Sequence, residues 1–170
     1  PLLAEPQANE TFTVEIKKTL NYWLYLPDGY KADETQKWPF VLFLHGAGER
    51  GSDLAKIKVH GPPKLVAQGK KFPFILASPQ CPDGQWWESD ALMALIENLE
   101  SKLRIDPDRI YMTGLSMGGY GTWALAMRYP DKFAAIAPVC GGGIPYRTKD
   151  IKHLPVWTFH GDADRAIEIS

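Results

Sequence analysis

The chain alternates short, mainly apolar runs with stretches of helical periodicity, and this alternation constrains its fold more than any other feature. The apolar runs are residues 40–44, 74–77, 109–113, 133–139 and 156–159. Such runs are typical of strands that are buried on both faces of a sheet. Leucine or isoleucine recurs with helical spacing from Leu92 to Leu103, and a second helix is predicted from Gly118 to Tyr129. We therefore expect an α/β fold, a mostly parallel sheet with helices on both faces.

The N-terminal region shows two different patterns. Residues 1–11 have no periodicity and contain two prolines, so we expect a loose arm there and a single domain over residues 12–170. Phe12, Val14 and Ile16 alternate with polar residues, and residues 20–26 form an aromatic-rich apolar run. These two segments predict a β-hairpin or two successive strands.

Composition excludes several classes of partner. The 170 residues include 19 basic and 20 acidic side chains, a formal charge of −1, and no basic stripe that could hold phosphate backbones. We therefore expect no nucleic-acid partner. No apolar run approaches the roughly 20 residues that a membrane helix requires, so we expect no membrane span.

A G-x-S-x-G sequence, Gly114 to Gly118, lies between a predicted strand and a predicted helix. This context is that of a nucleophile elbow, a tight turn that holds a serine in a strained backbone conformation above the sheet edge. Small residues are needed two positions before and after the serine because side chains there would collide. Ser116 is therefore the candidate nucleophile. The backbone N–H of Met117, at the start of the helix, is a candidate oxyanion donor.

A second glycine-rich segment, His45-Gly46-Ala47-Gly48, follows the neighbouring apolar run. Its backbone N–H groups could complete an oxyanion hole next to the elbow. We favour the N–H of Ala47, with that of Gly48 as the alternative. The His45 side chain is interpreted as a structural histidine rather than a base.

The segment His160-Gly161-Asp162-Ala163-Asp164 follows the last apolar run and is expected at the same sheet edge. A carboxylate there could orient a histidine, and spacing alone leaves Asp162 and Asp164 both open. His160, Asp162 and Asp164 make a poor metal site because no further ligand cluster exists. We expect neither a metal nor an organic cofactor.

Trp86 and Trp87 follow the second apolar run and are expected near the same edge. Two interpretations remain open for them, a wall of the substrate pocket or packing in the core and rim. Cys81 and Cys140 each end a predicted strand. Three strand spacings, about 14 Å, would separate them in the sheet order given below, so we expect two free thiols.

Together these segments resemble the α/β-hydrolase superfamily, and within it bacterial carboxylesterases of the predicted-peptidase, feruloyl-esterase and polyhydroxybutyrate-depolymerase-like group. The similarity is carried by residues 43–53 (FLHGAGERGSD), 106–143 and 159–164 (FHGDAD). It implies the sheet order 1-2-4-3-5-6-7-8 and a serine carboxylesterase that forms an acyl-enzyme on Ser116. The family pattern H-G-x-x-D selects Asp164 as the acid. A small ester would be the substrate, and the resemblance favours an extracytoplasmic location, periplasmic or secreted.

The chain departs from the family pattern at the third triad member. The resemblance places the catalytic histidine after strand 8, whereas His45, His60, His153 and His160 all precede Asp164. Strand 8 and the last helix are absent as well, so the domain is expected to be C-terminally incomplete. We expect a separate C-terminal segment of the same protein to supply the histidine, with His60 as the one conceivable substitute. The alternatives are a serine peptidase of the same fold and a catalytically incomplete binding form.

Overall fold

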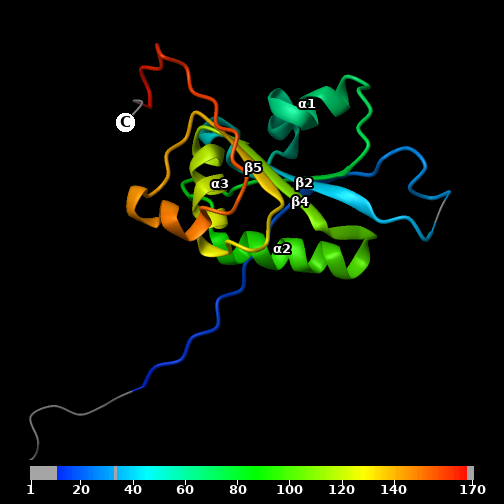
Figure 1. Ribbon diagram of the computed structural model, residues 1–170, viewed down its shortest axis with the longest axis horizontal. Coiled ribbons are helices and arrows are strands. Elements are labelled where there is room, and N and C mark those ends of the chain that lie inside the picture. Colours follow the sequence, from blue (N-terminus) through cyan, green and yellow to red (C-terminus); the bar gives the residue numbers. More distant parts are fainter. Residues whose placement is uncertain (1–10, 33, 168–170) are drawn as a thin grey trace, which may run out of the picture.

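A computed structural model describes residues 11–32 and 34–167 of the chain, and its centre is a single twisted sheet (Figure 1). The strands, in sheet order, are β1 (Tyr22–Tyr25), β3 (Ile75–Pro79), β2 (Trp38–Leu44), β4 (Ile105–Leu115) and β5 (Ala135–Val139). Only β1 is antiparallel to its neighbour, and the remaining pairs are parallel. The order agrees with the second to sixth strands of the expected topology.

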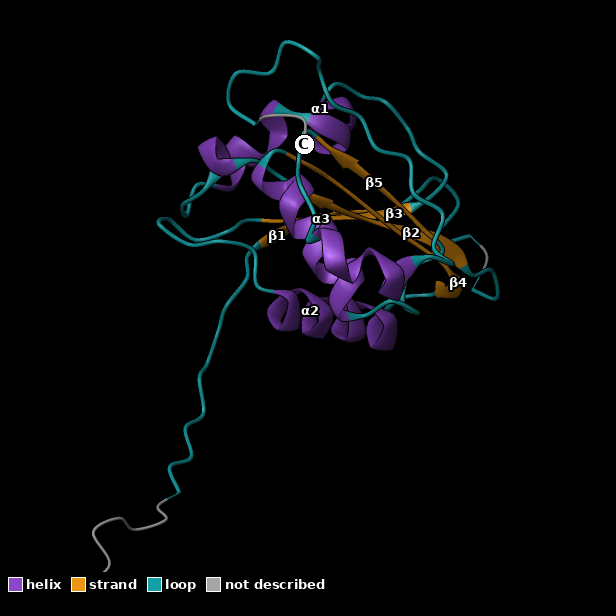
Figure 2. Cartoon of the chain, turned by 60° about the vertical axis from the view of Figure 1, so that its left-hand side comes forward, coloured by secondary structure: helices purple, strands orange, loops and turns teal. Residues whose placement is uncertain are grey.

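Helices cover both faces of this sheet, as the alternation of patterns predicts. The helices α2 (Ser89–Lys102) and α3 (Met117–Arg128) lie together below the sheet in Figure 2, and α1 (Gly61–Ala67) lies on the other side. Short 3₁₀ helices, η1 (Ala47–Glu49), η2 (Leu54–Val59) and η3 (Pro145–Ile151), connect the larger elements. The parallel strands end at one edge of the sheet, so the loops after β2, β3, β4 and β5 gather there.

The main core lies between the sheet and the two longer helices. Phe40, Leu42 and Leu44 alternate along β2 and are fully buried, together with Ile96 of α2 and Leu125 of α3. Removal of this apolar area from water, at about 25 cal/mol per Å², is the main stabilising contribution. On the opposite face, a hollow of about 440 Å³ lies over β4 and β5. Its lining includes Val41, Tyr111, Thr113, Ala135, Ala137 and Trp157.

The prediction of a hairpin from residues 12–26 is wrong in its first half. Phe12, Val14 and Ile16 are exposed, and residues 11–21 form no strand. The apolar alternation was misleading because this segment does not pair with β1. Instead, Lys18 forms a solvent-exposed ion pair with Glu88 at the start of α2. The second half of the prediction is confirmed as β1.

The predicted fifth parallel strand, residues 156–159, is present only as two isolated parallel bridges to β5. The backbone N–H groups of Trp157 and Phe159 donate to the carbonyls of Ile136 and Pro138, each at 3.1 Å. Pro138 has no N–H to return a bond in the middle of this ladder, which explains why no continuous strand forms. The segment still lies along β5 at the edge of the sheet.

Candidate active site

Ser116 occupies the turn between β4 and α3, with φ 55° and ψ −116°. A positive φ is strained for a residue with a Cβ, and such strain is concentrated at functional turns. The Ser116 N–H donates to the carbonyl of Val139 at 2.9 Å, which ties the turn to the end of β5. The predicted strand–turn–helix geometry is therefore confirmed, and it holds the half-buried serine at the carboxyl edge of the sheet.

Close backbone packing explains the glycines around Ser116. A Cβ on Gly114 would lie 2.3 Å from the Gly118 carbonyl oxygen, and a Cβ on Gly118 would lie 2.0 Å from that of Leu44. A Cβ on Gly119 would lie 2.6 Å from the Val139 carbonyl oxygen. The start of α3 thus packs directly on the ends of β2 and β5. No larger residue fits these positions without moving a strand.

The loop that follows β2, residues His45–Asp53, is called the β2 loop below. At Gly46, an added Cβ would lie 3.6 Å from the Ser116 Cβ, so this loop passes directly beside the candidate nucleophile. Ala47 begins η1 and is exposed. The structure therefore brings the two predicted oxyanion segments, Ala47 and Met117, to the same edge from two neighbouring strands.

His45 is buried and fully engaged. Its Nε2 accepts a hydrogen bond from the Cys81 N–H at 3.0 Å, and its Nδ1 lies 2.6 Å from the Gly46 carbonyl oxygen. The proton is thus assigned to Nδ1, because Nε2 acts as an acceptor. Burial is the largest influence on its pKa and lowers it below 6.5, so the ring is neutral. The contacts agree with the interpretation of His45 as a structural residue.

Glu49 is a partly buried carboxylate beside this site. Its Oε2 would lie 3.3 Å from a Cβ on Gly46, the same point that lies 3.6 Å from the Ser116 Cβ. Its two oxygens lie 4.0 Å from Nδ1 of His45 and 3.7 Å from Nε2 of His60. The structure therefore places His60 near the β2 loop, as predicted, but pairs it with Glu49.

Asp164 lies in a turn beyond residue 159. One carboxylate oxygen accepts hydrogen bonds from the N–H groups of Ala166, at 2.8 Å, and Ile167, at 3.0 Å. These bonds are the main reason that the pKa of Asp164 lies below its usual value. The other oxygen lies 3.5 Å from Nε2 of His160. Asp162 is exposed in the same turn.

The structure does not assemble a complete triad from these residues. Over residues 11–32 and 34–167, no histidine forms a hydrogen bond with the Ser116 hydroxyl. His45 bonds Cys81, His153 lies 3.2 Å from the Pro130 carbonyl oxygen, and His160 lies 2.8 Å from that of Ile167. The described residues thus hold the candidate nucleophile Ser116 and the candidate acid Asp164, and no histidine of that part of the chain bonds Ser116.

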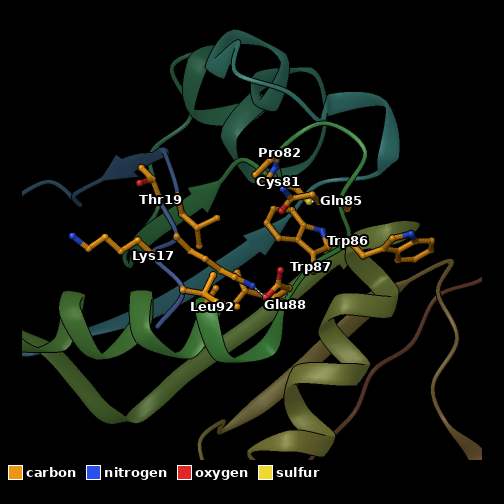
Figure 3. A pocket seen from close by; sticks show the side chains of 13 residues that line it. Lys17, Thr19, Cys81, Pro82, Gln85, Trp86, Trp87, Glu88 and Leu92 are labelled. Atoms are coloured by element: carbon orange, nitrogen blue, oxygen red, sulfur yellow. Dashed lines mark hydrogen bonds and ion pairs between the residues drawn. The ribbon is translucent and has the colours of Figure 1, made fainter. Parts of the chain in front are cut away.

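Trp86 and Trp87 have different surroundings. Trp87 is a buried core residue that packs edge-on against His45 and donates from Nε1 to the His45 carbonyl at 3.2 Å. Trp86 is 62% exposed, and its ring stands at 79° to that of Tyr120. Both line a cavity of about 410 Å³ beside residues 16–20 (Figure 3). Ser116 is not part of that lining, so packing accounts for Trp87, and a pocket role over Ser116 stays a prediction.

Within the described ranges, no group of three or more histidine, cysteine, aspartate or glutamate residues could hold a metal ion. In that same part of the chain, no helix is long and apolar enough to cross a membrane. Cys81 and Cys140 are both free. Burial raises the pKa of the Cys81 thiol, which lowers its reactivity.

Sequence reasoning missed the residues that hold the β2 loop in place. The Gln80 amide donates to the carbonyls of Glu49, at 2.9 Å, and Asp53, at 2.8 Å. Arg50 donates to the carbonyls of Ala47 and Gln85. No motif or periodicity marks Gln80, because its role depends on contacts between segments 27 to 31 residues apart.

Comparison with known proteins agrees with this geometry. Residues 83–166 match the prolyl oligopeptidase family. The chain is 30% identical over 145 residues to poly(3-hydroxyalkanoate) depolymerase C of Paucimonas lemoignei, covering 75% of this chain and 32% of that protein. It is 31% identical over 183 residues to "Putative esterase NocK" of Nocardia uniformis subsp. tsuyamanensis, covering 96% and 52%. The chain thus spans about half or less of these relatives.

Two more relatives and one solved structure are similar to the chain. Relatives from Aspergillus terreus and Arthroderma benhamiae are named "Probable feruloyl esterase C" and "Uncharacterized secreted protein". The crystal structure of a thermostable esterase superimposes with a TM-score of 0.73 at 35% identity, covering 87% of this chain and 44% of that one. The strand order, the strained serine turn and these matches lead to one conclusion, that the chain belongs to the α/β-hydrolase superfamily, among its esterase-type members.

Proposed function

We propose that the protein is a serine carboxylesterase that hydrolyses carboxylic esters through an acyl-enzyme on Ser116. One observation carries this proposal, namely that Ser116 has a φ of 55° at a glycine-packed turn between β4 and α3, directly beside the β2 loop. Backbone strain at a residue with a Cβ is concentrated at functional sites. A nucleophile held clear of its neighbours needs such a conformation.

In this mechanism, the Ser116 oxygen attacks the ester carbonyl and a histidine accepts its proton. The N–H groups of Met117 and Ala47 stabilise the oxyanion of the tetrahedral intermediate. The alcohol then leaves, and water hydrolyses the acyl-enzyme by the same route. Met117 is well suited to its role because it is the first residue of α3, where helix N–H groups are free of intrahelical partners.

Asp164 orients the base in this proposal. Backbone N–H groups hold its carboxylate and lower its pKa, so the group stays ionised and can support an imidazolium. The base is proposed to be a histidine other than His45, His153 and His160, whose ring nitrogens contact the backbone of Cys81, Pro130 and Ile167. His60 pairs with Glu49 beside the β2 loop, and no hydrogen bond joins it to Ser116 among the described residues. The relatives carry the matched region within longer single chains, which gives no support to a separate segment as the source.

The substrate is proposed to be a small ester with an apolar or aromatic acyl group. Trp86 is exposed, and its partner Tyr120 donates its N–H to the Ser116 carbonyl at 3.0 Å. Tyr120 therefore lies one helical turn after Ser116 in α3, with the Trp86 ring at 79° to its own ring. The two rings could bind an aromatic acyl group by edge or face contacts. Trp86→Ala is expected to change KM and acyl preference more than stability.

A serine peptidase of the same fold is the second candidate function. The match of residues 83–166 to the prolyl oligopeptidase family is the observation that favours it. Both reactions use the same acyl-enzyme chemistry, so geometry at Ser116 does not distinguish them. The relative turnover of p-nitrophenyl esters and peptide p-nitroanilides distinguishes the two reactions.

The experiment uses the protein that carries this chain, an aryl ester substrate and a fluorophosphonate probe. We expect covalent labelling at Ser116 and ester turnover, and Ser116→Ala should abolish labelling and lower kcat by about three orders of magnitude or more. Ser101→Ala is the matched control, because Ser101 is exposed on α2 and its hydroxyl donates to the Asn98 carbonyl in the same helix. Retention of turnover in Ser116→Ala would refute the proposal.

Location is proposed to be extracytoplasmic. The observations behind this are the resemblance to secreted esterases and the relative that is named a secreted protein. Fractionation of cells that express the protein from its natural full-length gene tests it. Recovery only in the cytoplasmic fraction would contradict it.

A further inference from the structure

The loop that follows β3, residues Gln80–Glu88, is called the β3 loop below. It lies against the β2 loop, and the two are joined by side chains as well as by backbone. The Gly51 N–H donates to the Cys81 carbonyl at 3.0 Å, and the Cys81 N–H donates to His45 at 3.0 Å. Apart from the single 3₁₀ turn η1, the β2 loop has no regular secondary structure in the described residues. Its position therefore depends on these contacts.

Gln80 makes the most central of these contacts. It is 3% exposed, and its Nε2 donates to the carbonyls of Glu49 and Asp53 at 2.9 and 2.8 Å. Two carbonyls facing one amide fix its orientation, because the reverse orientation would bring three acceptors together. The Gln80 Oε1 is buried and has no hydrogen-bond partner among the described residues. Two hydrogen bonds from this one buried amide therefore hold the backbone of the β2 loop at Glu49 and at Asp53.

Arg50 makes a second connection at the surface. Its Nε donates to the Ala47 carbonyl at 3.0 Å, and its Nη1 donates to the Gln85 carbonyl at 3.2 Å. The rigid guanidinium therefore links the residue proposed as oxyanion donor to the β3 loop. Because the Ala47 carbonyl and the Gly48 N–H belong to one peptide unit, this bond also fixes the orientation of the loop after Ala47.

We infer that Gln80 and Arg50 are positioning residues for the oxyanion hole, which act by holding the β2 loop against the β3 loop. This inference rests on the proposed function, since it assumes that the N–H of Ala47 stabilises the oxyanion. Neither side chain touches the reacting atoms. Each restricts the loop so that the Ala47 N–H is in place before the tetrahedral intermediate forms, which is the condition for electrostatic stabilisation.

The test compares Gln80→Met and Arg50→Leu with the unchanged protein. Methionine has nearly the volume of glutamine but cannot donate, and Arg50→Leu removes both surface bonds without altering the core. We expect kcat for an aryl ester to fall by about 10- to 100-fold in each variant with KM nearly unchanged, as for a donor that is displaced by a fraction of an ångström. The affinity for an aryl boronic acid, which mimics the tetrahedral intermediate, should fall by the same factor.

Ser78→Ala is the matched control for the buried site. Ser78 lies in β3, two residues before Gln80, and is 1% exposed. Within the described part of the chain, its hydroxyl has no hydrogen-bond partner. Its loss should leave kcat, KM and boronate affinity unchanged. If Gln80→Met fails to fold, Arg50→Leu still decides the question, because its side chain lies at the surface.

The outcomes separate this inference from the proposed function. If the unchanged protein neither labels at Ser116 nor turns over esters, the proposed function fails. If the unchanged protein is active and Arg50→Leu and the folded Gln80→Met keep its kcat and boronate affinity, the positioning role is refuted. A fall in both quantities at constant KM, absent from Ser78→Ala, supports it.

Discussion

Replacement of Gly118 by alanine tests how the nucleophile turn is built. Its added Cβ would lie 2.0 Å from the carbonyl oxygen of Leu44, 2.5 Å from the carbonyl carbon and 2.8 Å from the His45 carbonyl oxygen. Ordinary carbon–oxygen contacts are about 3.3 Å or longer, so the overlap exceeds about 1 Å. The obstructing atoms belong to the backbone, and Leu44 is paired with Gly114 in the sheet. They cannot move aside as a flexible side chain could.

The expected consequence has two parts. Overpacking of this kind costs about 1–3 kcal/mol or more of unfolding free energy, measured by urea denaturation. Any shift of Leu44 also moves the β2 loop that follows it. Displacement of about 1 Å at a catalytic group can lower the rate by about 100-fold, so kcat for an aryl ester should fall by at least this factor.

Two other glycines provide the comparison. Gly161 has no atom within 4 Å of an added Cβ, so Gly161→Ala should leave stability and kcat unchanged. At Gly46, the added Cβ has contacts of 3.3–3.6 Å and the backbone has φ −78°, so stability should change little. Its methyl group would stand beside the Ser116 Cβ, and kcat should fall. If Gly118→Ala matches Gly161→Ala in both measurements, the proposed packing of the turn is wrong.

Two further predictions concern His45 and Ser116. Burial lowers the pKa of His45 in the folded protein, so the unfolded chain binds more protons at this residue as the pH falls. The neutral His45 ring therefore contributes its full share of the folding stability above about pH 6.5, and this share is lost as the pH falls below that value. The unfolding free energy of His45→Gln should therefore fall less steeply than that of the unchanged protein between about pH 7 and pH 5, the range around the ordinary histidine pKa. Equal slopes of unfolding free energy against pH in the two proteins would contradict this. Ser116→Gly should be more stable than Ser116→Ala by about 1 kcal/mol, because glycine adopts a positive φ without strain. Equal stabilities in denaturant titrations would show that the turn is unstrained.

The elements that the sequence predicted well are those whose pattern is set by burial or local sterics. The apolar run from Phe40 to Leu44 could only be a strand covered on both sides, and it is the centre of the sheet. The turn at Ser116 was predictable because the glycines that its geometry requires are adjacent in sequence. In both cases, the physical cause acts within a few residues of the observed pattern.

Elements whose structure depends on a distant partner were not predictable in this way. The alternation of Phe12, Val14 and Ile16 predicts a strand, but these side chains are exposed and the segment pairs with no strand. Lys18, next along the chain, forms an ion pair with Glu88. Residues 156–159 lie along β5 as expected, yet the missing N–H of Pro138 interrupts the ladder. That interruption follows from proline chemistry only after the pairing partner is known.

The backbone strain of the described residues is concentrated at the sheet edge that carries the site. Outside glycine, positive φ occurs there at Ser116, with 55°, and at Cys140, with 39°. The N–H of Ser116 bonds Val139 at 2.9 Å and that of Cys140 bonds Phe159 at 2.7 Å, so each strained residue is held by the strand or segment next to it. A Cβ on Gly141 would lie 2.4 Å from the carbonyl carbon of Gly119, so the backbones of the two turns are in close contact. The conformation at Ser116 is thus maintained by the end of β5 as much as by its own motif, and a change at Gly141 should act on the nucleophile without touching it.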